Sequence, residues 1–239
     1  KRQALDAHAN IEVRLFNPSR SRAGVLGRAT EMLLRPMAMN RRMHNKAWIA
    51  DGRVAVVGGR NVGDEYFDAA AQTNFMDLDA VLIGPAVAQT SAIFDDFWNS
   101  ASVIPLSALT TAEPGALEKL RENGDAGYRS AQAADYVARL RGTPGVRALV
   151  GGNALHWLDE VGVYSDPASK GQGEGQGQWL VHRLGRAMGE AKRELRVISP
   201  YFVPGTEGTR WLVGKRAEGV DVSVLTNSLA ANDVMAVHG

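Results

Sequence analysis

The sequence contains no cysteine and no long hydrophobic run. Without cysteine there are no disulfide bonds, cysteine nucleophiles or thiolate metal sites, which fits a reducing compartment. Without about 18 consecutive apolar residues, no transmembrane helix is predicted in these 239 residues. Aromatic residues are also sparse, at 7%, but 45% hydrophobic and 22% charged residues are typical of a globular protein with one large or two small cores.

The net charge of +1 hides an uneven distribution. Residues 1–60 carry a balance of +8 and the remainder carries −7. Such a basic excess suits an anionic substrate or an anionic membrane face, although surface arginines that only solvate loops would give the same count. Much of it lies in 19–43, where arginines alternate with Leu and Met and Pro36 limits a predicted helix. This segment fits either a membrane interface or a helix packed on the core.

A β-hairpin is the clearest local prediction. Two strand-like runs, 43–50 and 53–57, flank Asp51-Gly52. Asp-Gly is a strong two-residue turn signal, because both central positions of the favoured turn need positive φ.

Three side chains of different chemistry are expected near this hairpin. Side chains alternate along a strand, so His44 and Lys46 should share a face with their Cα atoms about 7 Å apart. Gly58-Gly59 should let the backbone turn where the second strand ends and return Asn61 to the same side. An imidazole, an ammonium and an amide held together in this way can bind a phosphoryl group.

Each of these features has an ordinary explanation when it is taken alone. A histidine on a strand is commonly a surface residue, and Asp-Gly or Gly-Gly needs no function. Together they form His-x-Lys-x4-Asp followed by Gly-Gly-x-Asn, which resembles the HKD signature of the phospholipase D superfamily. The flanking segments resemble the bacterial cardiolipin synthases, above all their C-type group: 11–18 (IEVRLFNP), 40–46 (NRRMHNK), 57–67 (VGGRNVGDEYF), 77–85 (DLDAVLIGP), 199–204 (SPYFVP) and 225–238 (LTNSLAANDVMAVH).

The remaining pattern predicts an α/β protein. Strands are expected at 11–16 and 78–83, helices at 87–98, 116–120 and 131–140, and a polar glycine-rich connector at 171–177. A helix over 178–195 precedes a βαβ unit, with parallel strands at 196–199 and 220–226 and a helix over 207–217.

The resemblance implies a specific domain arrangement. The superfamily fold is an α/β/α sandwich with a mixed, largely parallel sheet, built from two pseudo-repeated units that each carry an HKD hairpin. Residues 1–150 would then be the later part of the first unit, 151–177 a connector, and 178–239 the early, truncated part of the second. The second HKD motif is not in this sequence, so the chain should be a fragment, or part, of something longer, and this puts the activity of the fragment alone in question.

The resemblance also assigns roles to residues. His44 would be the nucleophile that forms a phosphohistidine, or its acid/base partner, and Lys46 and Asn61 would bind the phosphate. Asp51 would orient a histidine, while Gly59 and His238 would support the site. No metal or other cofactor is expected, and the five histidines lack metal-ligand spacing.

The expected reaction is transfer of a phosphatidyl group to phosphatidylglycerol, giving cardiolipin, with phosphatidylethanolamine as a second candidate donor. The protein would be bacterial and peripheral at the inner membrane, with no nucleic-acid partner. One alternative is another HKD phosphodiesterase, either a lipid hydrolase or a nuclease. A nuclease, however, should interleave basic residues with stacking aromatics rather than Met and Leu. The other alternative is a non-catalytic lipid-binding module.

Overall fold

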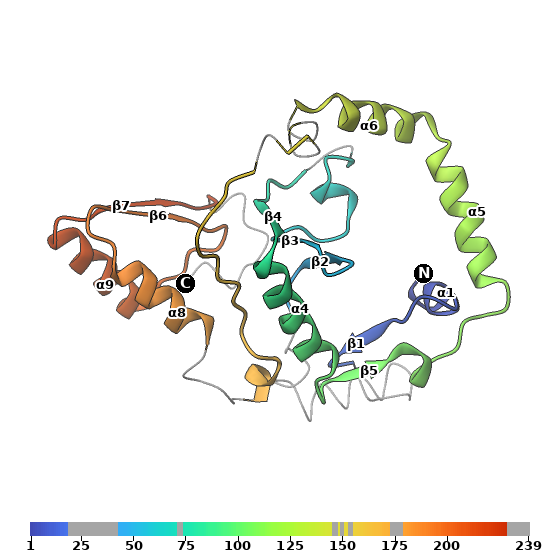
Figure 1. Cartoon of the computed structure of the whole chain (residues 1–239), viewed down its shortest axis with the longest axis horizontal. Coiled ribbons are helices and arrows are strands. Elements are labelled where there is room, and N and C mark those ends of the chain that lie inside the picture. Colours follow the sequence, from blue (N-terminus) through green and yellow to red (C-terminus); the bar gives the residue numbers. More distant parts are fainter. Residues whose placement is uncertain are drawn as a thin grey trace. The chain divides into compact units, whose positions relative to one another are not determined.

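The computed structural model describes residues 1–18, 43–70, 74–144, 148, 151–152, 155–172 and 179–228. The chain divides into two compact units, Lys1–Gly175 and Gln176–Gly239. Both units combine helices with strands, so the α/β class is confirmed (Figure 1). None of the helices in the described ranges is both long and apolar enough to cross a bilayer.

The first unit contains, in chain order, α1 (Arg2–Asp6), β1 (Arg14–Phe16), β2 (Ala47–Ala50), β3 (Val54–Gly58), the 3-10 helix η1 (Asp64–Tyr66), β4 (Asp79–Ile83), α4 (Pro85–Trp98), β5 (Val103–Pro105), η2 (Leu106–Ala108), α5 (Ala116–Tyr128), α6 (Ala131–Gly142) and η3 (Ala168–Gln172). The second contains α8 (Leu180–Gly189), β6 (Glu194–Ile198), α9 (Gly205–Ala217) and β7 (Asp221–Leu225).

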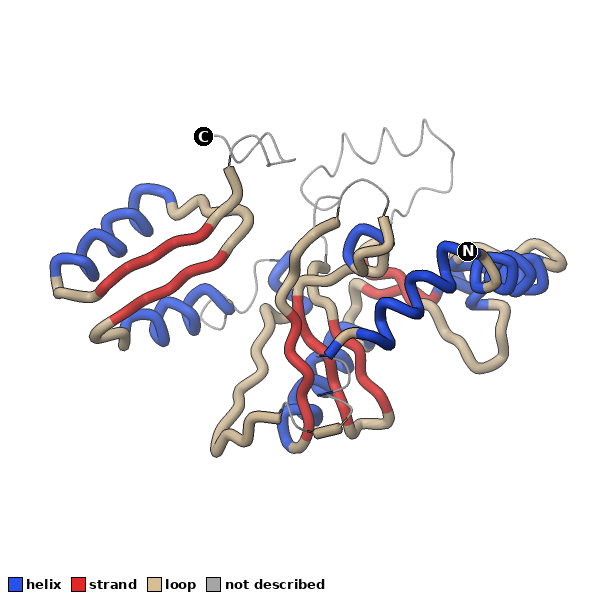
Figure 2. Tube along the Cα trace, turned by 90° about the horizontal axis from the view of Figure 1, so that it is seen from above, coloured by secondary structure: helices blue, strands red, loops and turns tan. Residues whose placement is uncertain are grey.

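Strands β2, β3 and β4 form an antiparallel sheet in that order and lie side by side in Figure 2. Strands β2 and β3 are the predicted hairpin, with Trp48 opposite Val56. The turn residues Asp51 and Gly52 have φ values of 52° and 65°. Positive φ at both central positions is what a type I′ turn requires, so the predicted reason for the hairpin is confirmed.

Strand β2 is shorter than predicted. It begins at Ala47, whereas the expected strand covered 43–50. The Lys46 ammonium donates a hydrogen bond to the carbonyl oxygen of His44 at 2.7 Å, so that acceptor is taken by a side chain rather than by a neighbouring strand. His44 and Lys46 therefore precede the strand, and the prediction that they share a strand face is wrong.

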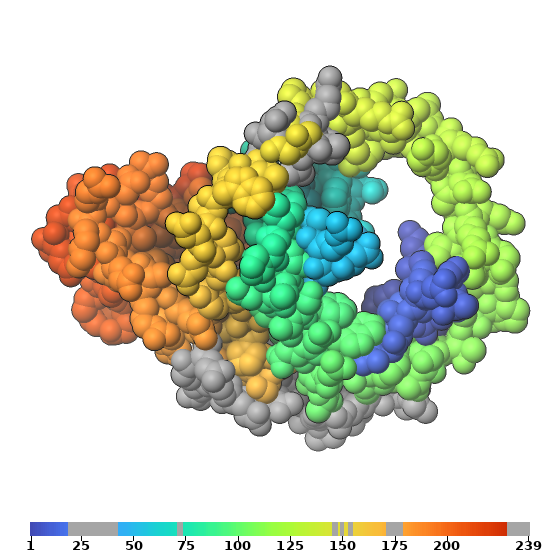
Figure 3. Space-filling model, viewed as in Figure 1, coloured from blue at the N-terminus to red at the C-terminus, as the bar shows by residue number. Residues whose placement is uncertain are grey.

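Helix α4 covers one face of this sheet. Its Ala86, Val87 and Thr90 are buried, as is Ala55 of β3. Figure 3 shows the side chains of α4 directly against the hairpin. Complete burial of a side chain such as Val87 contributes about 1.5–3 kcal/mol. The Thr90 hydroxyl donates to the Ala86 carbonyl at 2.9 Å, so burial leaves it satisfied.

The aromatic end of α4 packs against β1, which pairs with β5 in an antiparallel sheet. The rings of Phe97 and Phe16 are 5.7 Å apart. The Arg14 guanidinium lies 4.3 Å from the Trp98 ring centroid and donates to the Trp98 carbonyl at 3.0 Å. The interpretation of the aromatic side as a packing surface is confirmed for Phe97 and Trp98, whereas Phe94 is 47% exposed.

Part of the predicted connector is attached to α4 (Figure 1). Gln89 donates to the carbonyl of Val161 at 3.2 Å and accepts from the amide of Val163 at 2.9 Å. The Asp96 carboxylate accepts from the amide of Ala168 at 3.3 Å. These bonds hold residues 161–168 along the helix.

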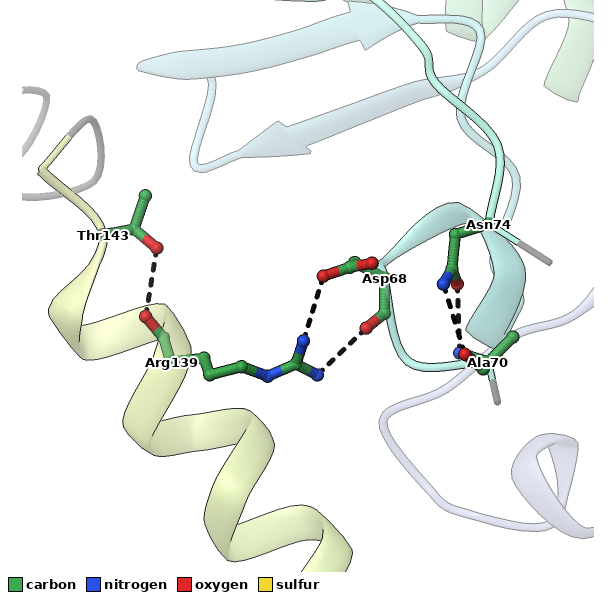
Figure 4. A network of polar contacts seen from close by, with 5 residues as sticks. All are labelled: Asp68, Ala70, Asn74, Arg139 and Thr143. Carbon is green, nitrogen blue, oxygen red and sulfur yellow. Dashed lines mark hydrogen bonds and ion pairs between the residues drawn. The ribbon is translucent and has the colours of Figure 1, made fainter. Parts of the chain in front are cut away.

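Helix α6 is tied to the loop that follows η1 (Figure 4). The Arg139 guanidinium donates to the carboxylate and to the carbonyl of Asp68, both at 3.1 Å. The Asn74 side chain exchanges two hydrogen bonds with the backbone of Ala70, at 3.1 and 3.2 Å. Beyond the end of α6, the Thr143 hydroxyl donates to the Arg139 carbonyl at 3.0 Å.

The second unit contains the predicted βαβ arrangement. Strands β6 and β7 are parallel and α9 connects them. Leu195, predicted as the last residue of a helix, instead lies in β6 opposite Val222, because α8 ends at Gly189. The buried Lys215 ammonium donates to the Gly189 carbonyl at 2.6 Å and so joins the end of α8 to α9.

One largely parallel sheet is not confirmed. The described strands form three sheets, of which β1-β5 and β2-β3-β4 are antiparallel and β6-β7 is parallel. A short turn between consecutive strands, such as that between β2 and β3, enforces antiparallel pairing, because a parallel pair needs a long crossover.

Candidate active site

Four of the predicted site residues, His44, Lys46, Gly59 and Asn61, lie at one end of the β2-β3-β4 sheet. Because the strands are antiparallel, the start of β2, the end of β3 and the start of β4 meet there. His44 and Lys46 precede β2, the Gly59–Asn61 segment follows β3, and Asp77 precedes β4. The sheet thus gathers three separate stretches of the sequence.

His44 and Lys46 are in direct contact. The Lys46 Nζ lies 2.8 Å from His44 Nδ1 and 3.5 Å from Nε2, in addition to its bond to the His44 carbonyl. The His44 residue is exposed, whereas Lys46 is half-buried. An accessible imidazole and an adjacent cation form the pair that nucleophilic attack on a phosphoryl group requires.

The charge of Lys46 is set by two opposing effects. Burial lowers the pKa of its ammonium below the ordinary lysine value, because desolvation disfavours the charged form. The Asp77 carboxylate acts in the opposite direction and raises the pKa. Sequence reasoning did not identify Asp77, although Asp77-Leu78-Asp79 places two carboxylates two residues apart where β4 begins.

The two glycines at the end of β3 allow close packing rather than the predicted tight turn. Neither Gly58 nor Gly59 has positive φ, so no left-handed turn requires them. A Cβ at Gly59 would overlap the Asp77 carboxylate, and a Cβ at Gly58 would overlap the Asp79 carboxylate and lie 2.8 Å from the Asp79 Cα. Because the two glycines have no Cβ, they leave space for the carboxylates of Asp77 and Asp79 at the start of β4.

Asn61 lies beside Tyr66 of η1. Its Nδ2 donates to the Tyr66 hydroxyl oxygen at 2.8 Å. Arg60, the residue before it, forms an ion pair with Asp79, with 2.6 Å between Nε and Oδ2. Sequence reasoning missed Arg60, Tyr66 and Asp79, because an arginine in a loop gives no indication of which distant residues it binds.

Two predicted site residues, Asp51 and His238, are not found with His44, Lys46 and Asn61. Asp51 lies in the hairpin turn at the other end of β2, seven residues from His44, which corresponds to roughly 20 Å of extended chain. Its positive φ gives it a role in the turn. His238 lies outside the described residues. Within the described part of the chain, no three His, Asp or Glu side chains are grouped so that they could hold a metal ion.

Comparison with known proteins identifies homologues of the chain. The chain is 38% identical, over 98% of its length, to cardiolipin synthase C of Escherichia coli, of which it covers 49%. This chain is a homologue of the bacterial cardiolipin synthases, members of the phospholipase D superfamily. It is also 27% identical, over 78% of its length, to cardiolipin synthase 1 of Bacillus cereus, of which it covers 30%.

The cardiolipin synthase homology extends over nearly the whole chain but not over whole relatives. The chain is 31% identical to an uncharacterized protein of Helicobacter pylori, again over 98% of its length and 47% of the relative. It therefore spans about half the length of the relatives that it matches along nearly all of its sequence. No family model and no solved structure matches the chain.

Proposed function

We propose that this chain carries one HKD half-site of a phosphatidyltransferase of the cardiolipin synthase type. The observation that supports it most directly is the contact between Lys46 Nζ and His44 Nδ1 at 2.8 Å. It occurs at the end of a sheet in a chain that is 38% identical to a cardiolipin synthase. A histidine and a lysine without that homology would be weaker support.

The proposed reaction takes two displacements at phosphorus. A ring nitrogen of His44 attacks the phosphodiester, the P–O bond to the departing alcohol breaks, and a phosphohistidine forms. The hydroxyl of a second lipid then attacks phosphorus, and the P–N bond breaks. Lys46 and Asn61 donate hydrogen bonds to the phosphoryl oxygens as negative charge increases on them. A second histidine, from a second HKD motif that is not in this sequence, would protonate the leaving alcohol and deprotonate the acceptor.

The Lys46 contact bears on which ring nitrogen of His44 carries the proton. A protonated lysine only donates hydrogen bonds, so it makes Nδ1 an acceptor and leaves the proton of a neutral ring on Nε2. A phosphoryl group offers Lys46 a stronger, anionic acceptor. Its binding would draw the ammonium from Nδ1 and give His44 a free nitrogen lone pair.

For the lipids we propose phosphatidylglycerol as acceptor and a phosphatidyl donor from the same membrane, either phosphatidylglycerol or phosphatidylethanolamine. The assignment of 1–150 and 178–239 to successive phospholipase D-like units, joined by 151–177, belongs to the same proposal. So does a peripheral location at the bacterial inner membrane.

The test is lipid turnover by the purified full-length protein on vesicles that contain phosphatidylglycerol, followed by mass spectrometry of the products. Wild-type protein should form cardiolipin, and His44→Ala should lose this activity. His182→Ala changes another exposed histidine, in α8, and serves as the matched control. Phosphatidic acid as the main product would indicate hydrolysis instead. Equal turnover by wild type and His44→Ala would refute the proposal.

A further inference from the structure

Arg60, which follows β3, links the end of that strand to η1 and to the start of β4. From the end of β3, its Nε binds the Asp79 carboxylate of β4 at 2.6 Å. Its Nη1 donates to the carbonyl of Tyr66, and its Nη2 donates to the carbonyl of Asp77 at 3.3 Å. The guanidinium also lies 5.6 Å from the ring centroid of Phe67.

Arg60 donates to the carbonyls of Tyr66 and Asp77. The side chains of these two residues interact with the proposed phosphate-binding residues Asn61 and Lys46. The Tyr66 hydroxyl accepts the hydrogen bond of Asn61 at 2.8 Å. The Asp77 carboxylate lies against Gly59 and interacts electrostatically with Lys46. Arg60 itself is 30% exposed and its partner Asp79 is 21% exposed, so the ion pair is only partly screened by water.

We propose that Arg60 is a positioning residue of the phosphoryl-transfer site, which holds Tyr66 beside Asn61 and Asp77 beside Gly59. This inference rests on the proposed function. Arginine suits the task because its planar guanidinium presents five donors in fixed directions, so that it can reach a carboxylate and two carbonyls together. A lysine at this position would retain the charge but would lack that geometry.

The kinetic test compares Arg60→Lys with Arg14→Lys. Arg14 has a closely similar environment at a distance from the site, with 26% exposure, a Glu12 carboxylate at 2.7 Å, the Trp98 carbonyl and the Trp98 ring. We expect Arg60→Lys to lower kcat about 10- to 100-fold, with KM changed less than about threefold, because small displacements of stabilising donors slow the chemical step. Arg14→Lys should retain kcat within about twofold at a comparable loss of Tm.

A purely structural role predicts a different result. The two variants would then lose kcat to the same extent, in proportion to their loss of Tm. That outcome, or an Arg60→Lys variant with kcat within about twofold of wild type, would overturn the proposal. Addition of Tyr66→Phe to Arg60→Lys should give less than the sum of the single effects, because both changes act on the same contact.

A second measurement does not depend on turnover. In the nuclear magnetic resonance spectrum, the side-chain amide of Asn61 can be assigned by its loss in Asn61→Asp. Its hydrogen exchange should accelerate about tenfold in Arg60→Lys, because the bond to Tyr66 is no longer held, and should not change in Arg14→Lys. Unchanged exchange in Arg60→Lys would refute the positioning role. If wild type and His44→Ala turn over lipid equally, the proposed function fails, while this measurement still decides the role of Arg60.

Discussion

Replacement of Gly58 by alanine is the most direct test of how the end of the sheet is packed. Gly58 lies opposite Asp79 in the β3–β4 ladder. A methyl group there would overlap the Asp79 carboxylate and lie 2.8 Å from its Cα. A carboxylate can rotate away, but a Cα atom moves only with the backbone of β4. The substitution must therefore displace the strand.

The expected loss of stability follows from two contributions. Overpacking of a well-filled position costs about 1–3 kcal/mol. Displacement of Asp79 also weakens its ion pair with Arg60, which contributes at most about 1 kcal/mol because both groups are partly exposed. A total of about 1–4 kcal/mol corresponds to a fall in Tm of roughly 2–16 °C for a protein of this size.

Thermal unfolding followed by tryptophan fluorescence provides the measurement, with Gly124→Ala as the control. Gly124 lies inside helix α5, and a Cβ there would meet nothing within 4 Å. Alanine at that position should stabilise the protein by about 0.5–1 kcal/mol, because glycine is a poor helix former. The change from glycine to alanine should thus lower the stability at position 58 and raise it at position 124. A Gly58→Ala variant that melts within about 1 °C of wild type would refute the packing argument.

Two further predictions concern Lys46 and the hairpin turn. Activity should decline at alkaline pH as Lys46 loses its proton. Because burial lowers the pKa of Lys46, the midpoint of this decline should lie at a pH below the ordinary pKa of lysine. Asp77→Asn removes a charge that raises this pKa, so the decline in a pH–rate profile should move to lower pH; a move to higher pH would contradict the assignment. Asp51→Asn should leave turnover within about twofold, since asparagine tolerates positive φ and the turn lies at the other end of β2. A tenfold loss of turnover in Asp51→Asn would instead indicate that Asp51 has a role in the site. Gly52→Ala should lower the free energy of unfolding by about 1–2 kcal/mol, as measured by urea unfolding, because alanine disfavours positive φ.

Local features of the fold could be predicted from the sequence. The hairpin followed from Asp51-Gly52, because few residue pairs accept positive φ at two successive positions. The βαβ unit followed from periodicity, since each of its elements is defined by neighbouring residues. Both depend on interactions between residues that are close in the sequence.

Features that depend on distant contacts could not be predicted in the same way. The start of β2 was placed too early, because alternation alone does not show that Lys46 donates to the His44 carbonyl. The two glycines suggested a tight turn, whereas they leave space for carboxylates much further along the chain. Gly59 faces Asp77, 18 residues later, and Gly58 faces Asp79, 21 residues later. Arg60 finds its partners only after β4 has paired with β3, so its role depends on the sheet.

The arrangement of the candidate site separates its reactive groups from the residues that support them. His44 and Lys46 lie before β2 and contact each other rather than the ladder. Order at this end of the sheet comes instead from β3 and β4, where the glycines accept two carboxylates and Arg60 fixes the backbone around them. Reactive side chains on a loop can change partners when a phosphoryl group arrives, provided that a rigid scaffold defines where it binds. Changes on the β3–β4 side should therefore affect the chemical step through geometry, while changes at His44 should remove the proposed nucleophile.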